Sequence, residues 1–397
     1  MSDPGDEVYT QLMRNADVLG TRDADSTSTV DWDFATGIVV ADINQGDHIY
    51  VRTGDQTRKN FQINPPEISI WGFWVKHVAT PIVTAVGLTG NTLSFLVMCY
   101  SQRLRTQSYS QLLCVLAVFD SLNLLINQIE LADEMVVYKT GHQSSFYTDL
   151  PNSVCKIYNF LKHVFLLGSS WLIVCLSVER VQAVCFPFKR TFLRRRFSVA
   201  ILVTITIAIL SLTQIFRILF IENVRGYCMA VQEYLSLYVY LHQYGYHLSL
   251  LFALPCVIVL SCNCAVIYKI YVIKKEAGDD SPPSLGSTRK ATTMLLLIGF
   301  VFIITMFPQF VCTSILLYYT DESRIHIGQH ILLKMRPYLE LFSVVSYTNY
   351  CINFGIYVLC GRSFRLEVCR MFKCNRRRNI FREKQTKRTE EVTPLQG

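Results

Sequence analysis

The sequence predicts an all-α membrane protein, a seven-transmembrane helix bundle with a short amphipathic cytoplasmic helix after the seventh span. Three observations predict this fold class. Hydrophobic residues make up 51% of the 397 residues, charged residues only 17%, and the mean hydropathy is +0.29. Seven windows are apolar over about 20 residues, the length that crosses a hydrocarbon core roughly 30 Å thick. Lys and Arg gather in every second connecting segment, as they do on the cytoplasmic side of membrane proteins.

The predicted spans are windows with few charges. They cover residues 75–100, 108–133, 155–178, 198–220, 243–271, 291–319 and 335–360, within a bundle at 71–361. Residues 279–287, between the fifth and sixth spans, contain prolines and are predicted to form a cytoplasmic loop that cannot extend a helix. Most of the 14 cysteines fall inside the apolar windows as small hydrophobic residues. No His or Cys spacing typical of a metal site occurs.

Charge sets the expected orientation. Residues 1–70 carry twelve acidic and five basic groups, whereas the segments after the first, third, fifth and seventh spans are basic. We therefore expect a flexible extracellular tail at 1–70 and a basic cytoplasmic tail at 375–397. The net charge of +8 reflects a cytoplasmic surface that attracts anionic lipid. Nucleic-acid binding is not expected, because the basic tail has no fold of its own.

Asp120 lies in the middle of the second predicted span. A charged carboxylate at this depth costs about 2.5 to 3.5 kcal/mol and needs a polar partner. Asn91, Asn349 and Asn353 lie at similar predicted depth. The alternative is a water-filled crevice around Asp120 with no function.

Over residues 75–374 the chain resembles the rhodopsin-like G-protein-coupled receptors. Asn91 and Asp120 match family markers, and Glu179-Arg180-Val181 is similar to the family's Asp-Arg-Tyr triplet. Further matches are Cys155 in span three, Pro255 and Tyr268 in span five, Phe302 and Pro308 in span six, and Asn353-Phe354-Gly355-Ile356-Tyr357 for Asn-Pro-x-x-Tyr in span seven. The resemblance implies a plasma-membrane receptor, not an enzyme, whose partners are an extracellular ligand, a heterotrimeric G protein and arrestin.

The resemblance also implies a mechanism. Span six, with Phe302, swings outward about Pro308, and Arg180 leaves Glu179 to meet Tyr268 and Tyr357. The alternative for Arg180 is a side chain that snorkels from a helix end to water. Asp120, Ser169, Asn349 and Asn353 resemble the family's sodium pocket, so an allosteric sodium ion is expected and no other cofactor.

Four cysteines have expected roles near the membrane surfaces. Cys155 and Cys228 face the oxidising exterior, so we expect a disulfide between them. Residues 362–374 have apolar residues at helical spacing with basic residues between them, a pattern that predicts an interfacial helix on membrane lipid. Cys369 and Cys374 near its end are candidate palmitoylation sites.

Two positions depart from the family pattern. Met306 stands where the family keeps a tryptophan two residues before the proline of span six, and Phe354 replaces the usual proline of span seven. Span four contains no tryptophan. These changes indicate a divergent branch, in which coupling through the tryptophan ring is in doubt.

The candidate ligand residues combine charged, polar and aromatic side chains, a lining that suits a peptide. They are Glu130, Tyr158, Asn159, Lys162, His163, Gln309 and Tyr347. Aminergic receptors have an aspartate at the position of Lys162, and opsins a lysine at that of Tyr347, so both classes are disfavoured. The chain resembles invertebrate neuropeptide receptors, including those for FMRFamide-like peptides.

In our hypothesis, Glu130 receives a ligand cation and Lys162 a carbonyl or anion; alternatively, the two residues pair with each other. His163 is a ligand contact or a packed polar residue. A non-peptide ligand is another alternative. A channel or transporter is disfavoured, because the sequence shows no inverted repeat or pair of interrupted helices.

Overall fold

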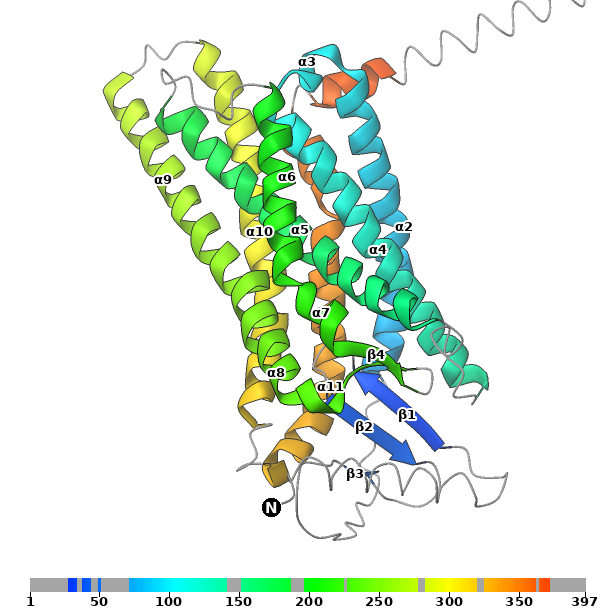
Figure 1. The fold of residues 1–397 in the computed structure, drawn as a ribbon. Helices are drawn as coiled ribbons and strands as arrows, with labels where there is room; N and C mark the ends of the chain where they lie inside the picture. Colours follow the sequence, from blue (N-terminus) through cyan, green and yellow to red (C-terminus); the bar gives the residue numbers. More distant parts are fainter. Residues whose placement is uncertain are drawn as a thin grey trace, which may run out of the picture.

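The computed structural model forms a bundle of long helices with short strands at one end (Figure 1). It describes residues 28–33, 38–43, 49–50, 71–140, 151–186, 196–224, 227–277, 283–319, 325–361 and 364–371. Strands β4 (Ile221–Val224) and β5 (Tyr227–Ala230) define one end, which we call the hairpin end. The opposite end carries the short helix α3 (Gln102–Arg105), and we call it the α3 end.

The long helices follow the predicted spans in order. They are α2 (Trp71–Tyr100), α4 (Ser108–Thr140), α5 (Asn152–Cys185), α6 (Arg196–Thr213), α9 (Leu254–Ala277), α10 (Pro283–Tyr319) and α11 (Ile325–Tyr347). Shorter pieces continue them: α7 (Ile215–Phe220), the 3-10 turn η2 (Gln232–Tyr234), α8 (Leu235–Tyr240), the π-helix η3 (Leu241–Ala253), the 3-10 turn η5 (Thr348–Tyr350) and α12 (Asn353–Cys360). Within the described residues, six helices are long and apolar enough to cross a membrane.

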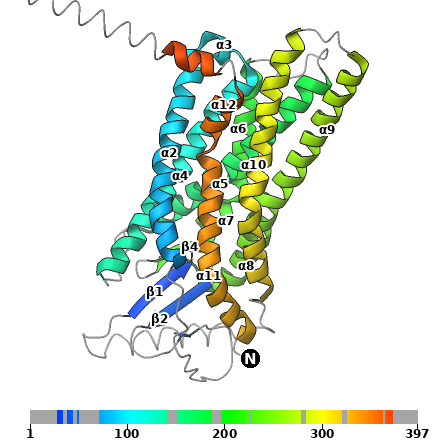
Figure 2. The same ribbon diagram turned by 180° about the vertical axis from the view of Figure 1, so that it is seen from behind.

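The seventh predicted span, 335–360, is not one uninterrupted helix. α11 ends at Tyr347, and η5 separates it from α12. Lys334, Arg336 and Glu340 lie within α11, which shortens its apolar stretch. α11 and α12 nevertheless form one column that packs against both α2 and α10 (Figure 2).

The fourth predicted span is also interrupted, at Gln214 between α6 and α7. The Thr213 hydroxyl donates to the Leu210 carbonyl (2.6 Å), and the buried Gln214 side chain accepts from Arg217 (2.9 Å). Side-chain bonds of this kind compete with the backbone ladder of a helix. The break therefore has a local cause that an average over an apolar window does not contain.

One loop prediction is wrong in part. Residues 283–287, predicted as part of a non-helical loop at 279–287, form the start of α10. Pro283 is tolerated there because the first residues of a helix have no intrahelical acceptor for their N–H groups.

The tail before α2 contains strands that the sequence analysis did not predict. β1 (Ser28–Asp33), β2 (Ile38–Ile43) and β3 (Ile49–Tyr50) form an antiparallel sheet in the order β1-β2-β3. Val30 pairs with Ala41, and Ala41 with Tyr50. The segment Ile38-Val39-Val40 has the β-branched residues that favour strands.

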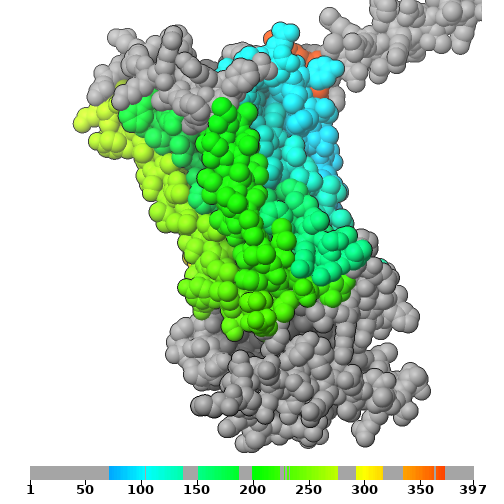
Figure 3. Space-filling view, viewed as in Figure 1, coloured from blue at the N-terminus to red at the C-terminus, as the bar shows by residue number. Residues whose placement is uncertain are grey.

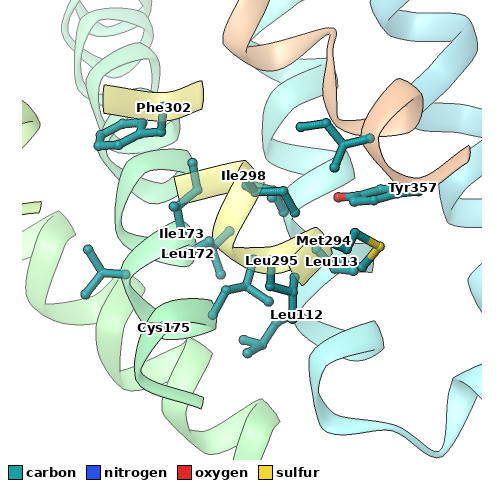
Figure 4. Close-up of a cluster of buried hydrophobic side chains, with 14 of the residues drawn as sticks. Leu112, Leu113, Leu172, Ile173, Cys175, Met294, Leu295, Ile298, Phe302 and Tyr357 are labelled. Atoms are coloured by element: carbon teal, nitrogen blue, oxygen red, sulfur yellow. The ribbon is translucent and has the colours of Figure 1, made fainter. Parts of the chain in front are cut away.

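The largest buried cluster joins four helices in the half of the bundle toward the α3 end (Figure 4). Its labelled members come from α4, α5, α10 and α12: Leu112, Leu113, Leu172, Ile173, Cys175, Met294, Leu295, Ile298, Phe302 and Tyr357. In lipid, such contacts stabilise a bundle by close packing, because the surrounding acyl chains are equally apolar.

Small residues permit the closest helix approaches. A β-carbon added to Gly168 in α5 would overlap Cε1 of Phe119 in α4. A β-carbon on Gly90 in α2 would lie 2.9 Å from Cβ of Phe354 in α12. Glycine at both positions therefore lets these helix pairs approach.

The opposite kind of surface is seen on α6, which forms an outer face of the bundle (Figure 3). Its exposed apolar side chains recur every three or four residues: Ile201, Ile205, Ile209 and Leu212. This stripe suits contact with lipid.

Candidate functional site

A buried polar cluster surrounds Asp120 in the middle of the bundle. Its carboxylate is fully buried and accepts hydrogen bonds from Ser169 Oγ (2.5 Å) and Asn353 Nδ2 (2.8 Å). These bonds join α4, α5 and α12. Asn349 is also buried, and its Oδ1 has no hydrogen-bond partner among the described residues.

Asn91 makes a different contact from the one expected. Its Nδ2 donates to the backbone carbonyl of Tyr350 in η5 (2.9 Å). The interrupted backbone between α11 and α12 is thus tied to α2, and Asn91 stabilises the break itself.

At the α3 end, Arg180 is buried and paired. Its Nε donates to Glu179 Oε2 (2.5 Å), its Nη2 forms an ion pair with the same oxygen, and its guanidinium lies over the Tyr109 ring at 4.8 Å. A cation above an aromatic face gains further electrostatic stabilisation. This geometry differs from a snorkelling side chain, which would extend to water.

The other predicted switch residues occupy contrasting positions. Phe302 and Tyr357 are buried, and the Tyr357 ring meets that of Phe364 at 5.5 Å. Pro308 lies inside α10, and Met306 is buried in the large apolar cluster. Tyr268 is exposed on α9, so this structure does not bring it to Arg180.

Toward the hairpin end, three candidate ligand residues meet between α4 and α5. Glu130 Oε1 accepts from Lys162 Nζ (2.5 Å) and from the Tyr158 hydroxyl (3.2 Å). The direct pairing of Glu130 with Lys162, the alternative to a pair of ligand contacts, is the arrangement in this structure. We call these three residues the Glu130 cluster.

The remaining candidates are separate from this cluster. Gln309 accepts from the Ser343 hydroxyl (3.3 Å), which links α10 to α11, and Tyr347 is half-buried at the end of α11. His163 is buried with its Nδ1 2.7 Å from the carbonyl of Asn159, and its ring packs against η3. His163 is therefore a packed polar residue in this structure.

The predicted disulfide between Cys155 and Cys228 is confirmed, with the two Cα atoms 5.8 Å apart. It ties β5 to the start of α5. A hydrogen bond from the Asn223 amide to Asn152 Oδ1 (3.0 Å) holds β4 to the same helix end. The hairpin is thus fixed over α5 at two points.

Residues 364–371 form a helix within the predicted segment 362–374. Phe364 packs against Phe354 with ring centroids 6.0 Å apart, and Cys369 is exposed. Cys374 lies outside the described residues.

Comparison with known proteins decides the family. Residues 90–357, which contain the polar and charged motifs above, match the family described as 7 transmembrane receptor (rhodopsin family). The chain belongs to this family. It is a multi-pass membrane receptor and not an enzyme, and the family implies an extracellular ligand and coupling to a G protein.

Relatives of this receptor differ in the ligands that their names state. It is 24% identical over 254 residues to purinoceptor 6 of Rattus norvegicus, covering 62% of this chain and 74% of the relative. It is 24% identical over 301 residues to growth hormone secretagogue receptor type 1 of Mus musculus, covering 72% and 77%. Lysophosphatidic acid receptor 4 of Mus musculus is 27% identical over 137 residues, 33% of each chain.

Sequence analysis missed two charged groups of the receptor. Lys76 Nζ in α2 lies between Glu134 of α4 (3.0 Å) and Glu340 of α11 (3.1 Å), which joins three helices. Arg217 in α7 is completely buried. Arg217 is the one charged residue in the predicted span 198–220, and that rarity was the available signal.

Proposed function

We propose that this receptor binds an extracellular peptide at the hairpin end and activates a heterotrimeric G protein by movement of α10. Family membership supports the ligand and the G protein in general. The positive-inside distribution supports an extracellular hairpin end and a plasma-membrane location. The resemblance to receptors for short amidated neuropeptides of the FMRFamide kind supports a peptide ligand.

The observation that carries the peptide proposal is the Glu130 cluster. The Glu130 and Lys162 side chains keep 26% and 17% of their surface exposed, so a ligand can approach both. A ligand cation replaces Lys162 as the partner of Glu130, and Lys162 then binds a ligand carbonyl or carboxylate. A peptide supplies both kinds of group, and each exchange conserves charge pairing.

Transmission to the α3 end follows from two contacts. Gln309, bonded to Ser343, directly follows Pro308, so a change at the ligand site acts on α10 next to its proline. Outward movement of α10 unpacks Phe302 and frees Arg180 from Glu179 to meet Tyr268 and Tyr357. A ligand that binds one arrangement more tightly shifts the population toward it. The opened end binds the G protein, and arrestin afterwards.

A sodium ion near Asp120 opposes this movement in our proposal. Asp120 has no cationic partner among the described residues, and Asn349 offers an unbonded buried oxygen. With Ser169 Oγ and Asn353 Oδ1 these atoms form the set of oxygen ligands that suits a hard cation. Palmitoylation of Cys369 and Cys374 then anchors the chain beyond α12 to lipid.

The experiment is a screen of amidated neuropeptides on cells that express the receptor, with calcium and cyclic AMP as readouts. For an active peptide, Glu130→Gln lowers potency at least about tenfold, because a charge-assisted bond to the ligand is lost. The matched control is Glu222→Gln on β4, whose carboxylate pairs with Lys156 at 3.5 Å and is 46% exposed.

Unchanged potency of the Glu130 variant at normal surface expression removes Glu130 from the ligand site. Responses to nucleotides or lipids with none to peptides establish the non-peptide alternative.

A further inference from the structure

Arg217 makes three hydrogen bonds, and all its acceptors are neutral. Its Nε donates to Gln214 Oε1 (2.9 Å), its Nη1 to the Tyr238 hydroxyl (3.0 Å) and its Nη2 to His242 Nδ1 (2.8 Å). No carboxylate pairs with Arg217 in the part of the chain that the structure describes. A guanidinium remains protonated in proteins, so a full positive charge is buried without an opposite charge.

Aromatic rings enclose this guanidinium. Its central carbon lies 4.6 Å from the Tyr246 ring centroid and 4.8 Å from that of Phe216. The His242 ring stacks on Tyr238 at 5.8 Å and on Tyr246 at 5.5 Å. Such rings attract a cation but leave its charge in place. We call Arg217, Tyr238, His242 and Tyr246 the Arg217 cluster.

Two members of the cluster have unused hydrogen-bonding capacity. Because arginine only donates, His242 Nδ1 must accept, and the imidazole proton is on Nε2. The Tyr246 hydroxyl is buried and has no hydrogen-bond partner among the described residues. A buried donor without an acceptor is unfavourable and indicates a missing partner. Together with the guanidinium, these groups supply donors for an anion.

The π-helix η3 carries two of these residues. His242 and Tyr246 both face Arg217 from η3. π-Helical turns are rare and occur frequently at functional sites. The local backbone thus has a conformation that is associated with binding, at the point where the buried charge needs a partner.

The Arg217 cluster adjoins the proposed peptide site through α5. His163 follows Lys162 of the Glu130 cluster, and its ring lies 5.0 Å from Tyr246 and 5.6 Å from His242. On the other side, α7 leads directly into β4, which lies at the hairpin end (Figure 1). One ligand beneath the hairpin can therefore reach both clusters.

We propose that the Arg217 cluster recognises an anionic group, phosphate or carboxylate, of the extracellular ligand. This inference rests on the proposed receptor function. The anion takes the place of Tyr238 and His242 at the two Nη atoms, and the planar guanidinium binds it through two parallel hydrogen bonds. His242 then donates through Nε2, and Tyr246 through its hydroxyl.

The test measures thermal unfolding of the purified full-length receptor, without G protein, in the presence of matched probes. The pairs are adenosine diphosphate and adenosine, a lysophosphatidic acid and a monoacylglycerol, and a random tripeptide library with free or amidated carboxyl ends. We expect one anionic member to raise the unfolding midpoint above that of its neutral partner, and the pair that responds identifies the source of the anion.

Arg217→Gln abolishes this shift, and Arg217→Lys retains a smaller one because lysine keeps the charge but not the fork. If Arg217→Gln does not fold, Tyr246→Phe serves as the second variant, and it reduces the shift. The matched control Arg370→Gln, an exposed arginine paired with Glu367, keeps it. For an agonist with the same anion, Arg217→Gln lowers potency roughly 10- to 100-fold.

The proposal is overturned if no anion shifts the midpoint relative to its neutral partner, or if Arg217→Gln shows the wild-type shift. Because this readout needs no signalling, its failure leaves the peptide and G-protein results of the cell assay intact.

Discussion

Removal of the Cys155–Cys228 disulfide tests how the hairpin contributes to the receptor. The two cysteines are 73 residues apart in the sequence. In the chain-entropy model, closing a loop of this length lowers the entropy of the unfolded chain enough to stabilise the folded state by about 4 kcal/mol. The Asn223–Asn152 hydrogen bond remains after removal and contributes on the order of 1 kcal/mol, so it does not compensate.

We expect Cys228→Ser to lower the unfolding midpoint of the detergent-purified receptor by roughly 10 °C. Cys155→Ser and the double variant should give the same decrease, because each removes the same covalent link. Cys369→Ser, which alters an exposed cysteine at the α3 end, is the control and should leave the midpoint unchanged. A decrease below about 2 °C, or a double variant much less stable than either single one, would refute this reasoning.

Three further predictions concern the bundle interior. Asp120→Asn should abolish the rise in unfolding midpoint when sodium chloride replaces choline chloride, and a sodium effect that persists in this variant contradicts the proposed ion site. Gly168→Val should destabilise the receptor by about 1 to 3 kcal/mol, since its β-carbon meets the Phe119 ring, and Phe119→Leu in the same chain should restore part of the loss. Glu179→Gln should raise ligand-independent nucleotide exchange on the G protein, because Arg180 loses its ion pair, and an unchanged basal rate at equal expression argues against that restraint.

The sequence predicted the polar contacts that family motifs identify. Asp120, Ser169 and Asn353 are far apart in the chain, yet each lies in a segment whose apolar length gives its depth in the membrane. Depth and motif together were sufficient to place them near one another. The disulfide was predictable for the same reason, since both cysteines lie near the same membrane surface.

Helix continuity was not predictable. An apolar window measures average transfer free energy, which is insensitive to whether the backbone makes α, π or 3-10 hydrogen bonds. The break at Gln214 and the π-helix η3 depend on individual side-chain bonds and on packing between helices. Arg217 was missed with them, because its role depends on which neighbours these irregular segments bring to it.

Helix direction also limits what a motif can tell. Tyr268 matches its family position, yet it is exposed on α9 in this arrangement. A motif describes residues that meet in some state of a protein, whereas a single structure shows one state.

The bond between Asn91 and the Tyr350 carbonyl means that the bend of the last transmembrane segment is a shared property of two helices. A proline normally leaves a carbonyl unbonded at such a bend, and here a 3-10 turn does so with phenylalanine at position 354. Because an amide from the first helix satisfies that carbonyl, the curvature of the last helix depends on a residue 259 positions earlier in the chain. Evolution could therefore dispense with the proline and keep the curve.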